Sequence, residues 1–183
     1  MQAARLARMI AVRPEAPGDA AAIARVHELA FGRPDEARLV DALRDSTAYL
    51  PERSLVAEVD DAVAGHVMLT RATVEDGEGG RAFVLMLAAI GVLPERRRAG
   101  VGSALVWAAL EAADGMGAPL VTVLGDPAFW HRFDFVAAYR HGVAPPTPIP
   151  GDAFQARARG RGPDPGIRGT LVYPAPFAAL GAD

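Results

Sequence analysis

The residues in this sequence that are best suited to bind a ligand form a short basic turn with two glycines. Residues 96–98 are consecutive arginines, and Gly100 and Gly102 follow them. An uncharged apolar run at residues 83–92 precedes the turn, and residues 101–114 follow it with apolar side chains at helical spacing. A strand, a glycine turn and a helix in this order present the free N–H groups and positive dipole end of the helix to an anion. The sequence therefore predicts a phosphate or pyrophosphate site at this turn.

The spacing of the turn excludes two common phosphate motifs. A P-loop needs a lysine between its second glycine and the following serine or threonine, whereas Ser103 follows Gly102 directly. The dinucleotide motif needs a third glycine where this chain has Leu105. Residues 97–102 instead fit a third pattern: glutamine or arginine, any two residues, glycine, any one residue, and glycine or alanine. This pattern resembles the acyl-CoA signature of the GNAT N-acetyltransferase superfamily. The alternative is a strand-to-helix connection with a solvated arginine face.

Four blocks of sequence, in the same order, are similar to the YhbS-like branch of predicted N-acetyltransferases. They are AFGRPDEARLVDALR at 30–44, GHVMLT at 65–70, LPERRRAGVGSALV at 93–106 and VLGDPAFWHRFDF at 123–135. The resemblance covers nearly the whole chain. It implies a GNAT-like acyl-CoA N-acyltransferase fold of the α/β (α+β) class, with a mixed, mostly antiparallel sheet whose central parallel strand pair is flanked by helices.

The resemblance also implies acetyl-CoA as the acyl donor and assigns positions to it. The pantetheine arm would bond to the backbone of Ile90, Gly91 and Val92, where the strand before the turn diverges from the next parallel strand. Gly91 fits a bulge there, or close packing against a neighbour. Backbone amides of the turn, with its arginine side chains, would hold the phosphates. The turn positions are Arg97, Arg98, Ala99, Gly100, Val101, Gly102 and Ser103.

The segment that often carries a catalytic tyrosine in this superfamily departs from the pattern. In residues 129–135, Trp130 replaces the tyrosine and Asp134 replaces a glycine. An indole N–H is not an acid at neutral pH, so the group that protonates the leaving thiolate stays unassigned. His131 and Asp126 are the candidate catalytic residues. Their competing interpretations are an exposed helix residue for His131 and a helix N-cap for Asp126.

Two functions follow from these observations. The first is an N-acetyltransferase that transfers an acetyl or short acyl group to an amine of an unidentified small-molecule or protein acceptor. The second is a non-catalytic acyl-CoA-binding module that has lost the usual tyrosine. We expect residues 31–50 and 140–168 to line the acceptor side of the cleft.

Composition disfavours several other classes of protein, namely metal-binding, nucleic-acid-binding and membrane proteins. The chain has 183 residues, 51% of them hydrophobic, no cysteine and a net charge of −3. The lack of cysteine and the spacing of the four histidines disfavour a metal site. The acidic balance disfavours nucleic acid as a partner, including for the arginine- and glycine-rich residues 157–168. No apolar run reaches the roughly 18 residues of a membrane span, and no secretion signal is evident. We therefore expect a cytoplasmic protein without nucleic-acid or membrane partners, and a homodimer through the C-terminal strands is compatible.

Periodicity and turn residues predict the order of the elements. We predict residues 1–9 as a disordered extension and residues 10–183 as a single domain. Asp19 is the predicted N-cap of the first helix, and the proline-rich residues 144–151 are a predicted surface loop. The predicted elements are strands at 10–14, 55–59, 63–74, 83–92, 119–124, from 135, 154–158 and 169–173, and helices at 20–30, 39–44, 101–114 and 128–133.

Overall fold

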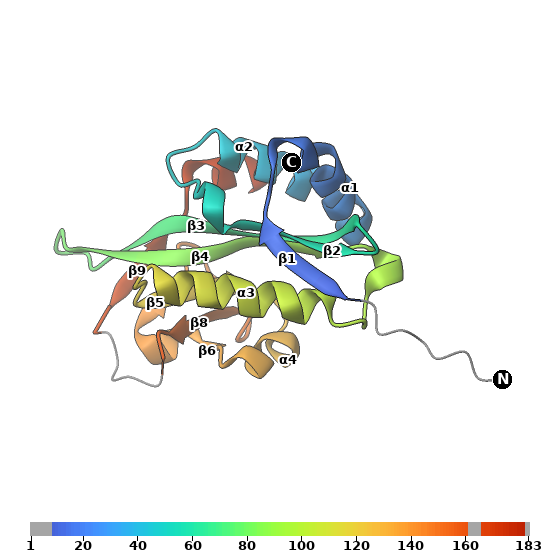
Figure 1. Cartoon of the computed structure of the whole chain (residues 1–183). Helices are drawn as coiled ribbons and strands as arrows, with labels where there is room; N and C mark the ends of the chain where they lie inside the picture. Colours follow the sequence, from blue (N-terminus) through green and yellow to red (C-terminus); the bar gives the residue numbers. More distant parts are fainter. Residues whose placement is uncertain (1–8, 161–165, 182–183) are drawn as a thin grey trace.

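The computed structural model describes residues 9–160 and 166–181, whose strands form one twisted sheet (Figure 1). The main path of the sheet is β1-β2-β3-β4-β5-β8-β6, while β9 pairs with both β3 and β7. The pairs β4–β5 and β7–β9 are parallel, and the others are antiparallel. The strands are β1 (Ile10–Pro14), β2 (Ser54–Val59), β3 (Ala62–Glu75), β4 (Arg81–Val92), β5 (Leu120–Leu124), β6 (Val136–Ala137), β7 (Val143–Ala144), β8 (Phe154–Ala158) and β9 (Gly169–Val172).

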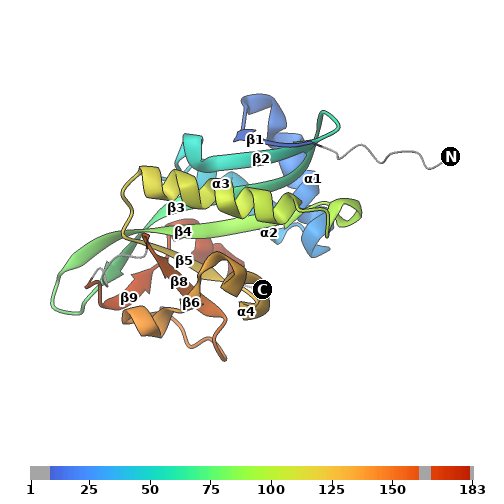
Figure 2. The same cartoon turned by 60° about the horizontal axis from the view of Figure 1, so that its bottom comes forward.

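Helices cover both faces of the sheet. In Figure 1, α1 and α2 lie above β3 and β4, and α3 lies below them. Figure 2 shows α3 running along β4 and α4 beyond β5. The helices are α1 (Ala20–Phe31), α2 (Asp35–Arg44), α3 (Val101–Gly115) and α4 (Pro127–Trp130), with 3-10 turns η1 (Pro17–Asp19), η2 (Pro51–Arg53), η3 (Pro94–Arg96), η4 (His131–Phe133), η5 (Ala138–His141) and η6 (Ala175–Gly181). The predicted fold class, with its central parallel pair, is confirmed.

Close packing of α3 on β3 fixes the turn that precedes this helix. Leu105 and Val106 are fully buried in the core between α3 and the sheet. A Cβ on Gly65 of β3 would lie 2.9 Å from Leu105 Cδ1 and 3.0 Å from Val101 Cγ1. Because such distances are shorter than van der Waals contact, only glycine at position 65 lets α3 lie this close to the sheet.

Most predicted boundaries agree with the structure, and the exceptions have local causes. Asp19 stands at the N-cap position of α1, but its carboxylate accepts hydrogen bonds from the Ala16 N–H at 2.7 Å and from Arg13 at 2.6 Å instead. The short β7 was not predicted, because two residues carry no periodic pattern. The proposed extension at 1–9 lies outside the described residues except for Met9, as do residues 161–165 of the arginine- and glycine-rich segment. Among the described helices, none combines the length and apolar character needed to cross a bilayer.

Candidate functional site

Strands β4 and β5 lie side by side for only a short distance. Their parallel pairing consists of Leu85 with Val121 and Met86 with Thr122. Beyond these pairs β4 continues to Val92 without a partner in β5, which ends at Leu124. The divergence predicted for the strand before the turn is therefore present, and it leaves one backbone edge of β4 open.

The irregularity in β4 lies at Ala88 rather than at Gly91. Ala88 has no partner in β3, because the register shifts there, whereas Gly91 pairs regularly with His66. A Cβ on Gly91 would lie 3.1 Å from Nδ1 of His27 in α1. The bulge interpretation of Gly91 is therefore wrong, and close packing of α1 explains this glycine.

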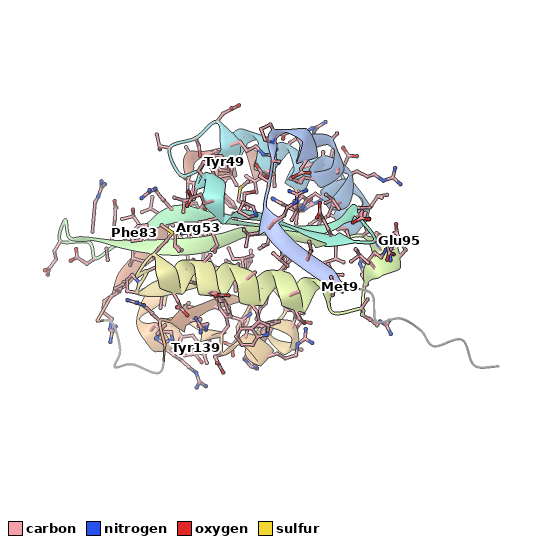
Figure 3. All side chains as sticks on the ribbon, in the orientation of Figure 1. Met9, Tyr49, Arg53, Phe83, Glu95 and Tyr139 are labelled. Atoms are coloured by element: carbon pink, nitrogen blue, oxygen red, sulfur yellow. The ribbon has the colours of Figure 1, made fainter. Side chains whose placement is uncertain are left out.

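The turn before α3 exposes a series of free backbone donors. Arg98 and Gly100 have left-handed backbone conformations, with φ of 57° and 88°. The first intrahelical bond runs from the Ala104 N–H to the Gly100 carbonyl at 2.9 Å. Within the described part of the chain, the N–H groups of residues 98–103 have no hydrogen-bond acceptor. The turn lies at the end of the sheet marked by Glu95 in Figure 3. Its N–H groups, together with the helix dipole, favour an anion.

The three arginines of the turn differ in their contacts. Arg96 donates to the Asp60 carboxylate at 3.2 Å, and Arg97 donates to the Ala30 carbonyl at the end of α1 at 2.8 Å. Arg98 makes no hydrogen bond or ion pair with any described residue. Two of the three charges are thus engaged in holding the turn, and the Arg98 guanidinium is the one left for a ligand.

Gly102 is a glycine that neither the backbone nor the packing requires. It lies in the first turn of α3, and a Cβ there would make ordinary contacts with Val92 Cγ2 at 3.6 Å and Phe129 Cζ at 3.9 Å. Gly100 differs, because its positive φ disfavours any side chain. The Val101 side chain is buried in the core, so this residue offers the surface only its backbone. A small side chain would therefore fit at position 102.

A cavity of about 520 Å³ occupies the gap between β4 and β5. Its walls come from β4, from the end of β5, from α4, from the α1–α2 segment and from the C-terminal segment. Phe129 lines the cavity and also borders Gly102, so the turn and the cavity adjoin. The lining residues from the sheet and α4 are Met86, Leu87, Ala88, Ala89, Ile90, Val123, Leu124, Gly125, Asp126, Phe129 and Trp130.

The candidate catalytic residues are not brought together. His131 is exposed and borders a separate depression with Asp134 and Arg140. Asp126 lines the cavity, but its carboxylate accepts the Ala128 N–H at 2.9 Å, which confirms the N-cap interpretation. Trp130 lines the cavity and is 3% exposed. An indole is thus buried at the position where the resemblance implies a phenol.

The far side of the cavity differs in part from the expectation. The α1–α2 segment contributes Phe31, Arg33, Glu36 and Leu39, as predicted. The described residues of 140–168 contribute none, and Tyr173 and Phe177 take that place. The reason is that β7 pairs with β9 and β9 pairs with the end of β3, which directs the following η6 toward α2. The place of Tyr173 in this wall could not be predicted from the sequence, because this strand order has no local signal.

A buried polar network lies beside the cavity, between α1 and the sheet. The carboxylate of Glu15 accepts hydrogen bonds from Arg44 at 2.8 Å, Tyr49 at 2.6 Å and Ser54 at 2.8 Å. Burial favours a higher pKa for Glu15, but the hydrogen bonds that its carboxylate accepts outweigh burial and hold the pKa well below its usual range. Burial, reinforced by the hydrogen bond to Glu15, raises the pKa of Tyr49 to about 12. Glu15 is therefore ionised and saturated with donors.

The two histidines of this network are neutral, and their tautomers follow from counting donors. Burial is the main cause that lowers the pKa of His27 to about 3 and also lowers that of His66. The single Ser54 hydroxyl proton goes to Glu15, so His66 Nε2 must donate to Ser54 Oγ at 2.8 Å. His66 Nδ1 then accepts from His27 Nε2 at 2.8 Å. This leaves a lone pair on His27 Nδ1, a buried atom without a hydrogen-bond partner among the described residues.

Comparison with known families and curated sequences gives one consistent result. The model of the Acetyltransferase (GNAT) family matches residues 20–135. The Uncharacterized N-acetyltransferase YjhQ of Escherichia coli is 36% identical over 133 residues, covering 72% of this chain and 73% of its own. The Uncharacterized N-acetyltransferase YhbS of the same species is 28% identical over 162 residues, covering 88% and 95%.

Solved structures show the same similarity in three dimensions. A GNAT family N-acetyltransferase (YhbS) from Escherichia coli in complex with CoA superposes with a TM-score of 0.83 at 29% identity, covering 95% of this chain and 94% of its own. A GNAT family acetyltransferase from Brucella melitensis in complex with acetyl-CoA has a TM-score of 0.74 at 33% identity, covering 93% and 99%.

Proposed function

Because this chain belongs to the acetyltransferase (GNAT) family, we propose that it transfers an acetyl group from acetyl-CoA to the nitrogen of an amine acceptor. We propose further that residues 10–183 work as one N-acetyltransferase domain. Two structures similar to this chain were solved with CoA and with acetyl-CoA, which supports the choice of donor.

The observation that carries the proposal is the set of free N–H groups at residues 98–103, next to a glycine that packing does not require. We propose that these donors hold the pyrophosphate and that Arg98 pairs with a phosphate of the nucleotide. The pantetheine arm would then lie in the gap between β4 and β5. Of the three predicted β4 positions, Ile90 lines this gap, while Gly91 is buried against α1 and Val92 borders Gly102. Ala88 also lines this cavity, and the edge of β4 beyond Met86 has no partner in β5.

The reaction joins the acceptor nitrogen to the acetyl carbon. A neutral amine attacks the thioester carbonyl, the C–S bond breaks, and one proton passes from nitrogen to the CoA sulfur, which gives an amide and free CoA. Backbone N–H groups at the bulge are suited to stabilise the negative charge that develops on the carbonyl oxygen. Trp130 cannot supply the proton, so in this proposal water or another cavity group takes the proton from nitrogen and gives one to the thiolate.

A non-catalytic acyl-CoA-binding module is the second candidate, and the burial of Trp130 in the tyrosine position favours it. The two candidates differ in turnover, not in binding. Release of CoA is measured with a thiol reagent, and the chain has no cysteine that would add background. We expect CoA release that depends on an added amine and is lost in Gly102→Val. Acetyl-CoA binding without amine-dependent release would favour the binding module. A folded protein that does not bind acetyl-CoA would contradict both.

A further inference from the structure

The wall of the cavity opposite α4 has a composition that bears on the acceptor, if the proposed function holds. It is mainly apolar, and Phe31, Leu39 and Phe177 line the cavity together with Met86 of β4. This wall can bury an aliphatic or aromatic group, and each CH₂ group buried is worth about 0.8 kcal/mol. The cavity is thus suited to an acceptor with an apolar body.

The charged groups of this cavity are few, and each has a partner. In the described part of the lining they are Arg33, Glu36 and Asp126. The Glu36 carboxylate, 13% exposed, accepts two hydrogen bonds from Arg33, at 2.6 and 3.2 Å. Asp126 caps α4. A polyamine or an aminoglycoside carries several ammonium groups, and each needs a carboxylate to offset its desolvation. The described lining has no such set of available carboxylates.

Tyr173 is the neutral polar group of this wall. Its side chain is half-buried, and burial raises its pKa, so the phenol keeps its proton at neutral pH. It packs against Phe177, with 5.4 Å between ring centroids. Its hydroxyl makes no hydrogen bond with any described residue, and Tyr173 lines the same cavity as Ile90 and Trp130. A protonated phenol both donates and accepts, so it suits a neutral amine nitrogen.

We propose that the acceptor is a primary amine carried on a single apolar or aromatic group, and that the Tyr173 hydroxyl positions its nitrogen. The Arg33–Glu36 pair closes the polar rim of the cavity. The apolar wall holds the body of the acceptor, and the nitrogen faces the gap between β4 and β5.

The test measures kcat/KM of the 183-residue protein for different amine acceptors at saturating acetyl-CoA. We expect kcat/KM to rise from ethylamine to butylamine to 2-phenylethylamine, and 2-phenylethylamine to exceed spermidine and kanamycin at least tenfold. Preference for spermidine or kanamycin, or turnover with none of the three apolar amines, would overturn the inference. A wild type that does not bind acetyl-CoA would instead remove the proposed function on which it rests, so calorimetry with acetyl-CoA is done first.

A matched pair of tyrosine variants tests the positioning role. Tyr173→Phe should raise KM for 2-phenylethylamine roughly 3- to 10-fold, as expected for one lost hydrogen bond, with unchanged affinity for acetyl-CoA and unchanged thermal stability. Tyr139→Phe is the control, because Tyr139 is 65% exposed and is not among the residues that line this cavity. Equal kinetics of the two variants, or an effect of Tyr173→Phe on stability alone, would overturn the role of Tyr173.

Discussion

The turn before α3 and the network around Glu15 both concentrate polar groups, but they differ in how far the protein satisfies them. In the network, Glu15 alone has donors from three other side chains within 2.8 Å. In the turn, the N–H groups of residues 98–103 have no acceptor among the described residues. Buried polar groups are costly unless they are paired, so the network must be complete for the fold to be stable. Donors at a solvent-exposed helix start can stay open for a ligand without such a cost.

The largest effect should come from breaking the network. Glu15→Gln removes the charge that Arg44 and Tyr49 face, and loss of one partner of a buried pair costs about 3–5 kcal/mol of unfolding free energy. Acetyl-CoA affinity of the folded protein should not change. Urea unfolding and calorimetry measure the two quantities. Glu52→Gln is the control, because the Glu52 side chain is 83% exposed. A network with no stabilising role would leave the two variants equally stable.

A larger side chain in the turn should lower the affinity for acetyl-CoA rather than the stability of the fold. Gly102→Val should weaken acetyl-CoA binding at least tenfold, because its methyl groups extend toward the gap beside Val92 and Phe129. Gly102→Ala fits the available space and should keep binding within about threefold, while a helical alanine adds roughly 0.5–1 kcal/mol of stability over glycine. Calorimetry and thermal unfolding check both variants. Strong binding by a folded Gly102→Val would place the ligand elsewhere.

Acid should destabilise the fold through the histidines of the network around Glu15. The pKa of His27 is about 3 in the folded protein against about 6.5 when unfolded, so the unfolded state binds the proton more readily below pH 6.5. Stability from this group is complete above pH 6.5 and falls by about 2 kcal/mol between pH 6.5 and 5. His27→Gln should flatten this slope, which denaturant titrations at several pH values record. Equal slopes in the wild type and in His27→Gln would contradict the assignment.

Substitution of the arginines in the turn should change the affinity for acetyl-CoA least. Arg98→Ala should weaken acetyl-CoA binding by roughly 3- to 10-fold at low salt and less at high salt, since an exposed charge is screened. Arg96→Ala removes a surface pair with Asp60 and should leave the affinity within twofold, since such pairs contribute only about 0–1 kcal/mol. Calorimetry at two salt concentrations distinguishes them. A larger loss in Arg96→Ala than in Arg98→Ala would reverse the roles assigned to them.

Local pattern and family resemblance predicted most of the fold. The ends of β4 and α3 were predicted to within two residues. Gly80 and Pro94 flank the apolar run of β4 and Gly115 ends that of α3, and glycine and proline commonly interrupt helices and strands. The resemblance also led to the divergence of β4 from β5. The position of the bulge was not predicted correctly, because a bulge at Ala88 depends on the register between two strands and alanine has no special backbone preference.

The open backbone donors of the turn were predictable, because they lie close together in sequence and follow from the helix start itself. The N–H groups of residues 98–103 are open, whereas the Arg97 N–H donates to the Pro94 carbonyl. The C-terminal part of the far wall was not predictable, since Tyr173 lines the same cavity as α2 only because β9 pairs with β3. The network was missed for the same reason, because Glu15 and His66 come from segments far apart in the sequence. Nothing in the spacing of these residues indicates that they are buried together.

The most direct test of the account is the response of backbone amides to CoA, followed by ¹H–¹⁵N correlation spectra of the labelled protein. We predict that saturating CoA shifts the amide protons of residues 98–103 downfield, as new hydrogen bonds to phosphate form, and leaves those of Ser54 and His66 in place. CoA binding without a shift at residues 98–103 would contradict the assignment of the turn as the pyrophosphate site.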